Sequence, residues 1–337
     1  MTQKIILITG GTGYIGSHAV VAFEQAGYQT VTIDNLSNSS LDAFDGVEKI
    51  LGYRPRFHRG DIRDGDFLRG IFSEYMFDGV IHFAGLKAVG ESCKDPILYH
   101  SNNVGGSIEL FRVMEENWVR NIVFSSSATV YHPENQSPLT EDMRLGTTNP
   151  YGTTKLVIEK LLEDLARDAH WSVISLRYFN PIGAHSSGYI GELPNGIPNN
   201  LLPYIMDVAI GKREKVWVYG DDYDTRDGTG VRDYIDVCDL VEAHISAYRH
   251  LASGYAPINI GTGTGTSVLE MIEMVQLVTS QTIPYEIAPR RSGDIAECFA
   301  RVDRASEILG WSSERNIGDS IANSWRYIQN MSQKKGE

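Results

Sequence analysis

The 337-residue sequence predicts an α/β fold: a Rossmann-type doubly wound parallel sheet with a smaller α/β carboxy-terminal lobe. Short β-rich runs alternate with helical patterns through the first half, a rhythm typical of a parallel sheet covered on both faces. A glycine-rich turn joins the first β-rich run to the first helical pattern. The length exceeds what one simple core needs, so we expect one large α/β domain and a second lobe.

Each element of the first half follows from its own pattern. Strands are predicted where short apolar runs are bounded by turn residues, and helices where apolar residues recur at a spacing near 3.6. The predicted strands are Lys4–Thr9, Thr30–Asp34, Arg56–Arg59, Gly79–Phe83, Asn121–Ser125 and Ser172–Tyr178, and the predicted helices are Ile15–Ala26, Asp66–Glu74, Pro96–Glu116 and Tyr151–Ala169.

The character of the chain changes near residue 180. Residues Asn180–Asn200 are rich in Gly, Pro, Ser and Asn, which predicts a long functional loop. We therefore divide the chain into residues 1–180 and 181–337 and expect some later segments to return to the first domain. The later predicted elements are helices Asn200–Ile210, Val237–His250, Ser267–Thr279 and Ile317–Asn330 and strands Lys215–Tyr219 and Pro257–Ile260.

Charge and composition exclude several classes of partner. The net charge is −13 and the basic residues are scattered, which disfavours nucleic acid and anionic membranes. No apolar run approaches the roughly 18 residues of a membrane span, and none forms a signal peptide core. The three cysteines show neither a CxxC pair nor metal-like spacing. We expect free thiols, no metal and a cytoplasmic protein.

The glycine-rich turn predicts a dinucleotide site. Gly11, Gly13 and Gly16 form a GxGxxG pattern between a buried-type strand and a helix, where a pyrophosphate can approach the backbone and the helix amino terminus. Asp34 ends the second strand 18 residues later and can accept hydrogen bonds from a ribose. No arginine follows it in residues 35–38, so we predict NAD over NADP. The alternatives are an ordinary glycine turn and an aspartate that caps a turn.

A second pattern predicts proton transfer. Tyr151 and Lys155 are spaced i and i+4, so on a helix an ammonium lies near a phenol and favours its phenolate. Ser127 follows the predicted strand Asn121–Ser125, at the sheet edge that faces a ligand crevice, and its hydroxyl could bridge Tyr151 and a substrate hydroxyl. Taken singly, a tyrosine and a lysine at this spacing are more often an exposed helix face, and serines at a strand end are usually turn formers.

Several long blocks resemble the UDP-galactose 4-epimerase family of the extended short-chain dehydrogenase/reductase superfamily. The resemblance runs from about residue 4 to residue 325, and ordered multi-residue blocks are more specific than any single motif. The blocks are Thr9–His18, Asp34–Leu36, Ile81–Ser92, Phe124–Tyr131, Leu176–Pro181, Gly196–Leu201 and Asp227–Tyr234.

The resemblance implies reversible inversion at C4 of a UDP-hexose through a 4-keto intermediate, with NAD retained. Residues 1–180 would bind NAD, and residues 181–337 would mainly bind the nucleotide sugar. Tyr151 would transfer the proton of the 4-hydroxyl, and Ser127 would bridge that transfer. Lys155 would bind the nicotinamide ribose and lower the pKa of Tyr151. The implied NAD site consists of Gly10, Gly11, Gly13, Tyr14, Ile15, Gly16, Asp34, Asn35, Leu36, Asp61, Ile62, Phe83, Ala84, Gly85, Lys87, Asn102, Tyr151, Lys155 and Phe179. The implied substrate site consists of Lys87, Ser127, Tyr151, Asn180, Asn200, Leu201, Arg232, Arg291, Asp294 and Cys298.

The resemblance also bears on specificity and assembly. Cys298 stands where some family members have a tyrosine, which implies room for an N-acetyl group and activity on UDP-GalNAc and UDP-GlcNAc. Helices Pro96–Glu116 and Tyr151–Ala169 resemble those through which the family forms homodimers. Asp236 and His132 depart from the family pattern and leave finer substrate preference open. A second glycine-rich run, residues 261–267, we interpret as a turn with Ser267 or Thr266 as helix cap.

Two other functions stay open. A sugar-nucleotide 4,6-dehydratase would share the tyrosine, lysine and cofactor loop, but Ala128 and Thr129 follow the serines where its elimination step needs an acid and a base. A regulatory protein that senses NAD without turnover has no need of Ser127, Tyr151 and Lys155 together.

Overall fold

The computed structural model describes residues 3–194, 196–291 and 293–334. In this part of the chain the large sheet has seven strands in the order β10-β6-β5-β4-β1-β2-β3, and every neighbouring pair is parallel. The predicted doubly wound fold is therefore confirmed. The strands are β1 (Ile5–Thr9), β2 (Gln29–Asp34), β3 (Arg56–Arg59), β4 (Gly79–His82), β5 (Asn121–Ser127), β6 (Ser172–Tyr178) and β10 (Gly254–Ile260).

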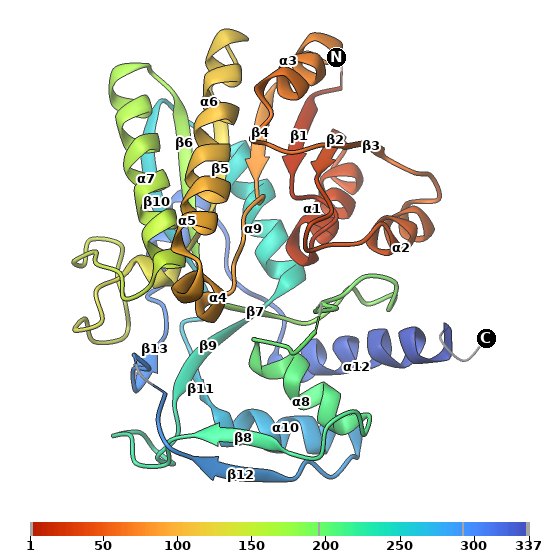
Figure 1. Cartoon of the computed structure of the whole chain (residues 1–337), viewed down its shortest axis with the longest axis vertical. Helices are drawn as coiled ribbons and strands as arrows, with labels where there is room; N and C mark the ends of the chain where they lie inside the picture. Colours follow the sequence, from red (N-terminus) through yellow and green to blue (C-terminus); the bar gives the residue numbers. More distant parts are fainter. Residues whose placement is uncertain (1–2, 195, 292, 335–337) are drawn as a thin grey trace.

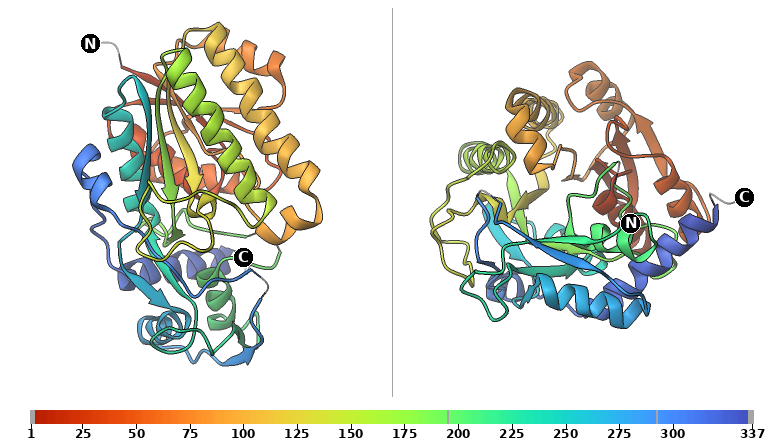
Figure 2. Two further views of the ribbon diagram at one scale, coloured as in Figure 1. Left: turned by 90° about the vertical axis from the view of Figure 1, so that its left-hand side faces the viewer. Right: turned by 60° about the horizontal axis from the view of Figure 1, so that its bottom comes forward.

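Helices cover both faces of this sheet (Figures 1 and 2). Each face has its own apolar core, because residues buried on both sides of parallel strands must meet helices on both sides. One face carries α3 (Gly65–Glu74), α6 (Gly106–Glu116) and α7 (Pro150–Asp168); the other carries α1 (Tyr14–Gln25), α2 (Asp42–Leu51), α9 (Val237–Arg249) and α11 (Asp303–Leu309).

The smaller lobe lies beyond the carboxyl ends of the strands (Figure 1). Its core packs α8, α10 and α12 against short strands. Its elements are β7 (Asn180–Ile182), α8 (Leu201–Ala209), β8 (Val216–Tyr219), β9 (Val231–Asp236), β11 (Gly265–Ser267), α10 (Val268–Thr279), β12 (Tyr285–Ala288), β13 (Glu297–Cys298) and α12 (Ile317–Lys334). β10 pairs with β6 in the large sheet although it follows residue 181, and the division of the chain at residue 180 stays a prediction.

The predicted single helix Pro96–Glu116 is wrong in detail. It consists of α5 (Pro96–Tyr99), a π-helical segment (His100–Gly105) and α6. Such π segments interrupt helices at functional sites. Eight further elements were not predicted from the sequence: α2, α4 (Val89–Lys94), β7, β9, β11, β12, β13 and α11.

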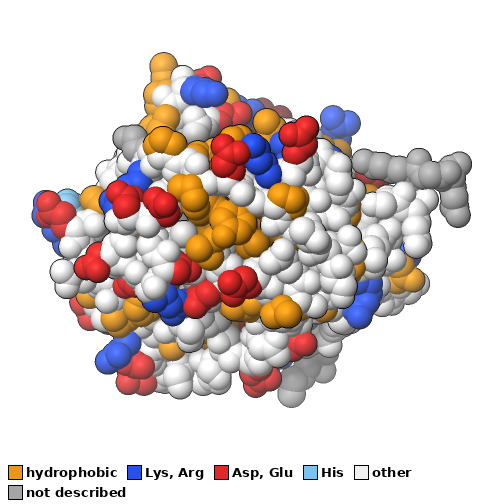
Figure 3. Space-filling view, turned by 90° about the horizontal axis from the view of Figure 1, so that it is seen from below, with side chains coloured by type: hydrophobic (Ala, Val, Ile, Leu, Met, Phe, Trp, Pro, Cys, Tyr) orange, Lys and Arg blue, Asp and Glu red, His pale blue; other side chains and the backbone are white. Residues whose placement is uncertain are grey.

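The face of the molecule seen from below carries acidic and basic side chains in a scattered mixture, with an apolar area near its centre (Figure 3). None of the described helices combines the length and apolar character that a bilayer crossing requires.

Candidate active site

The glycine-rich turn between β1 and α1 fits a phosphate-bearing ligand. Gly10 has φ +71°, and a Cβ on it would lie 2.8 Å from the backbone nitrogen of Ala84. A Cβ on Gly16 would lie 2.1 Å from the carbonyl oxygen of Gly10. Gly13 precedes α1 and has no side chain that could cap its first N–H groups. The helix amino terminus is therefore left to an anionic group.

Asp34 organises the loop that follows β2. Its carboxylate accepts hydrogen bonds from Thr12 N at 3.2 Å, Leu36 N at 2.9 Å and Ser39 Oγ at 2.9 Å. The contact with Leu36, which has φ 63°, is the turn role that the sequence left open. Asp34 is only 8% exposed and lies at the carboxyl end of β2, where the sequence predicts the ribose.

The structure brings Asn35 and Asp61 together at the end of β3. Asn35 Nδ2 donates to Asp61 Oδ2 at 2.9 Å. Arg63 grips the same carboxylate with two side-chain nitrogens and lowers the pKa of Asp61 to about 2. The neighbouring predicted residue Ile62 is buried, as is Phe179. These contacts fix an ionised carboxylate, paired with Arg63, where the sequence predicts the adenosine.

The π-helical segment connects the loop after β4 to α7. The Asn103 amide donates to Leu86 O and to Thr154 Oγ1, both at 3.0 Å, and its oxygen accepts from Leu86 N at 2.8 Å. Thr154 donates in turn to Tyr151 O at 2.7 Å. Asn102, the predicted cofactor residue, donates to Asn103 at 3.0 Å. Asn103 was not predicted, because its role depends on partners that are distant in the sequence.

Ser127, Tyr151 and Lys155 converge where β5 meets the start of α7. Asn149 caps α7 by accepting from Gly152 N at 2.9 Å, which fixes Tyr151 in the first turn. Lys155 Nζ donates to the Ser125 carbonyl at 2.7 Å and lies 5.9 Å from the centre of the Tyr151 ring. Thr129 donates through N and Oγ1 to Ser127 Oγ, which leaves the Ser127 proton free for another acceptor.

Burial controls the protonation of these groups. It raises the pKa of Tyr151, and the Ser127 hydroxyl partly opposes that rise. The sequence predicted that Lys155 lowers the pKa of Tyr151; in this structure the ammonium is instead directed at a backbone carbonyl. Burial also lowers the pKa of Lys155 to about 8, with Glu159 opposing it. The lysine is thus mostly charged at neutral pH but discharges not far above it.

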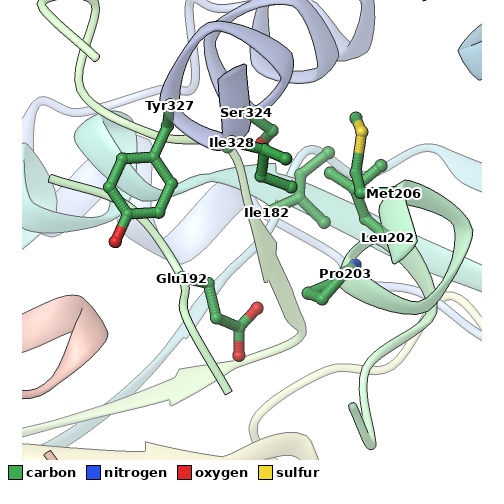
Figure 4. Close-up of a pocket in the computed structure, with 9 residues that line it drawn as sticks. Ile182, Glu192, Leu202, Pro203, Met206, Ser324, Tyr327 and Ile328 are labelled. Carbon is green, nitrogen blue, oxygen red and sulfur yellow. The ribbon is translucent and has the colours of Figure 1, made fainter. Parts of the chain in front are cut away.

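Lys87 and Asn200 donate to one carboxylate, Glu192, which was not predicted as a site residue. Glu192 Oε1 accepts from Lys87 Nζ at 2.9 Å and from Asn200 Nδ2 at 2.7 Å. Asn200 precedes α8 without a side-chain capping bond, because its amide is turned to Glu192. Glu192 lines a pocket between α8 and α12, with Pro203 and Tyr327 among its neighbours (Figure 4). Glu192 therefore accepts hydrogen bonds from residues of both halves of the chain.

Three predicted substrate residues lie on adjacent strands of the smaller lobe. Arg232 of β9 is in register with Cys298 of β13, and Asn180 of β7 is in register with Tyr234 of β9. Burial raises the pKa of the Cys298 thiol to about 11, and Arg232 opposes that rise. Cys298 is therefore a neutral, small side chain beside an arginine.

Arg291 and Asp294 form the other part of the predicted substrate site. Arg291 Nε donates to Asp294 Oδ2 at 2.8 Å, and its guanidinium lies 4.8 Å from the centre of the Tyr219 ring. Tyr219 and Trp217 alternate with buried valines on β8 and are 40% and 38% exposed. This alternation was the available sequence signal for two exposed aromatic side chains, and neither was predicted as a site residue. Leu201 begins α8 directly after Asn200.

The remaining predicted cofactor residues surround the same edge of the sheet. Tyr14 donates from its hydroxyl to Gly183 O at 2.8 Å and so connects α1 to the loop after β7. The Phe83 ring lies 4.8 Å from that of His244. Ile15 stands in the first turn of α1, Ala84 donates its backbone N–H to Thr9, and a Cβ on Gly85 would lie 3.3 Å from Asn103.

The fold and the site are those of an NAD-dependent enzyme that acts on sugar nucleotides, and the comparison with known proteins supports this class. Residues 6–261 match the NAD dependent epimerase/dehydratase family, so the chain belongs to that family. Within it, the chain is a member of the UDP-glucose 4-epimerases: it is 52% identical over 325 residues to the UDP-glucose 4-epimerase of Bacillus subtilis (strain 168), covering 96% of each protein. The resemblance inferred from the sequence blocks is thereby confirmed.

Solved structures agree over the whole chain. The UDP-glucose 4-epimerase of Stenotrophomonas maltophila, with bound NAD and formylated UDP-arabinopyranose, superposes with a TM-score of 0.96 at 45% identity, covering 98% of this chain and 100% of that one. The UDP-glucose 4-epimerase of Bifidobacterium longum, in complex with NAD⁺ and UDP, gives 0.93 at 47% identity, with 97% and 98% covered. The prediction of an NAD-dependent epimerase is confirmed.

Proposed function

We propose that the protein interconverts UDP-galactose and UDP-glucose by inverting C4 through a 4-keto intermediate, with NAD retained. The observation that carries this proposal is the convergence of Ser127, Tyr151 and Lys155 at the carboxyl end of β5. The residues around the glycine-rich turn between β1 and α1 fit the cofactor. Its glycines let a pyrophosphate approach the backbone closely, and Asp34 would accept hydrogen bonds from the ribose hydroxyls. When bound, NAD supplies the reversible oxidation of C4.

Tyr151 would remove the proton of the 4-hydroxyl and later return it. Its buried hydroxyl keeps the proton at neutral pH in the free protein, so it needs nearby positive charge to act as a base. Lys155, one helical turn away, supplies such a charge. Ser127 can relay the proton, because its oxygen accepts from Thr129 while its own hydrogen stays available.

The nucleotide end of the substrate would lie on the smaller lobe. Arg232 and Arg291 can grip a diphosphate with two donors each. Asn180, Asn200, Leu201 and Asp294 would complete the substrate site, with Lys87 reaching it from the loop after β4. We propose that Cys298 leaves room for an N-acetyl group at C2, so that UDP-GalNAc and UDP-GlcNAc are also interconverted.

We further propose that two copies pair through α5, α6 and α7. Apolar side chains on these helices remain open to solvent in the single chain: Ile97 is 80% exposed, Val157 40% and Ile108 39%. An apolar helical face of this kind supports an isologous dimer. The free thiols of Cys93, Cys238 and Cys298 support a reducing, cytoplasmic setting.

The test is to incubate the purified protein, without added NAD, separately with UDP-galactose and UDP-GalNAc and to resolve the sugar nucleotides chromatographically. Conversion of both to their C4 epimers is expected. Conversion of UDP-galactose alone would refute the open pocket at Cys298. No conversion of either, with or without NAD, would favour a 4,6-dehydratase or a protein that binds NAD without turnover.

A further inference from the structure

Three residues spaced by four on α7 contact three consecutive serines at the end of β5. This pairing extends the catalytic motif by one helical turn, because Glu159 stands on the same face of α7 as Tyr151 and Lys155. In order along the helix, Tyr151 faces Ser127, Lys155 donates to the Ser125 carbonyl at 2.7 Å, and Glu159 Oε1 accepts from Ser126 Oγ at 2.5 Å.

Glu159 is held by a buried arginine of β6. Arg177 Nε donates to Glu159 Oε1 at 3.0 Å and Nη2 donates to Oε2 at 2.7 Å, and both side chains are only 2% exposed. Burial of both charges costs desolvation free energy that can exceed their mutual attraction, so the pair contributes little net stability to the fold. Its position directly behind the reacting groups gives it another use.

The contacts of Arg177 continue to the wall of the predicted sugar site. Arg177 Nη1 donates to the Tyr131 hydroxyl at 3.2 Å, and that hydroxyl donates to Asn259 Oδ1 at 2.5 Å. Asn259 Nδ2 donates to Leu139 O at 2.8 Å, and Leu139 N donates to Phe299 O at 2.9 Å. Phe299 is the neighbour of Cys298, so one hydrogen-bonded path joins the proton-transfer helix to the segment that carries the proposed specificity residue.

We infer that Glu159 and Arg177 form a positioning unit for the epimerase reaction, which holds the Ser125–Ser127 segment in register with α7 and maintains the positive charge of Lys155. The inference rests on the proposed function. Neither residue touches the reacting atoms; both act through Lys155 and Ser127.

Glu159 supplies the negative charge that keeps Lys155 protonated. Burial lowers the pKa of Lys155 to about 8 and Glu159 raises it. The other groups that face the lysine cannot replace that charge: burial keeps Tyr151 and Tyr178 protonated and neutral and lowers the pKa of His82 to about 3. Arg177, behind Glu159, is positive. Loss of the Glu159 charge therefore lowers the pKa of Lys155 further.

The experiment measures kcat for UDP-galactose against pH in Glu159→Gln and in the double variant Glu159→Gln with Arg177→Met. The single change leaves a buried arginine unpaired and can impair folding; the double change removes both charges while the Gln carbonyl still accepts from Ser126. Asp239→Asn is the matched control, because Asp239 is a buried carboxylate that pairs with Arg315 away from Lys155.

Glu159 acts on the pKa of Lys155 and Arg177 does not figure among its causes. We therefore expect the alkaline limb of kcat in the double variant to move toward acid by up to about one pH unit, so that kcat falls by up to about tenfold at pH 8.5 and much less at pH 6.5. The control should lose thermal stability without moving the limb. A folded double variant with the wild-type limb would overturn the inference while leaving the epimerase function intact. A wild type that converts no UDP-galactose would overturn the function and the inference together.

Discussion

Lys87 Nζ lies 2.9 Å from Glu192 Oε1, although 105 positions separate the two residues. The lysine belongs to the loop after β4 and the glutamate to the loop that leads into α8. The Lys87 side chain is 58% exposed and that of Glu192 only 10%. The Glu192 carboxylate thus accepts hydrogen bonds from Lys87 and Asn200, and both of these residues are predicted to contact an anionic substrate.

Glu192→Gln should strengthen UDP binding. The change removes a negative charge near the diphosphate and releases Lys87, and because the pair is partly exposed the gain is modest, about two- to fivefold in Kd. Titration calorimetry with UDP at low and high salt measures it, and the difference from wild type should shrink at high salt. Asp45→Asn, an exposed partner of Arg54, is the control. Weaker UDP binding in Glu192→Gln would mean that Glu192 helps to hold the substrate.

Tyr151→Phe should be nearly inactive and still carry NAD. The change removes only the hydroxyl that exchanges the proton, which is worth about 10²–10⁴-fold in kcat. Turnover of UDP-galactose and the absorbance of released cofactor are measured on one preparation. Substantial turnover with a normal NAD content would remove Tyr151 from the proton path.

Cys298→Tyr should abolish turnover of UDP-GalNAc and preserve that of UDP-galactose. A phenol in place of the thiol fills the space beside Arg232 that the N-acetyl group would need. Cys298→Ala, which keeps the pocket open, should retain both activities. Equal loss of both activities in Cys298→Tyr would instead indicate general damage to the β9–β13 pairing.

Stability should fall steeply between pH 6 and pH 4. Burial lowers the pKa of His18 and His82 to about 3 and that of His244 to about 4, whereas the unfolded histidines titrate near 6.5. Below pH about 6.5 the unfolded chain therefore binds more protons, so stability is fully present above that pH and is lost as the pH falls.

Denaturant unfolding at several pH values measures this slope, which should approach the uptake of three protons on unfolding. His244→Phe should reduce that uptake by about one proton, whatever its effect on stability at pH 7. A flat profile from pH 7 to pH 5 would show that these rings are not held neutral.

Ile97→Glu should convert the proposed dimer to a monomer. A charge at an 80% exposed apolar position of α5 costs little in the single chain but would be buried against a second copy. Sedimentation at micromolar concentration gives the mass, and Met76→Glu, at a 91% exposed position, is the control. A wild-type mass of one chain would contradict the dimer outright.

Local sequence patterns predicted the elements that are stabilised locally. β1, β6 and α7 lie within two residues of their predicted bounds, because buried apolar runs and caps such as Asn149 are visible in the sequence. The second glycine-rich run is a helix cap as predicted: Ser267 and Glu270 form a capping box.

Elements that depend on distant partners escaped prediction. β9 contains Asp233, a buried carboxylate that accepts from Thr262 N and Oγ1, Gly263 N and Ala300 N, so nothing in its own neighbourhood marks it as interior. The same holds for Glu192, whose partners are contributed by two other segments. In the candidate site, residue types and spacings predicted which groups could react, while the contacts that orient them required the structure.

The return of β10 to the large sheet has a consequence for synthesis on the ribosome. β6 remains an unpaired edge with open backbone groups until residues 254–260 have left the exit tunnel. A nascent chain that already contains the glycine-rich turn and α7 still exposes this edge of β6, which can pair with other polypeptides. We therefore expect the chain to need a chaperone most during translation pauses before residue 260.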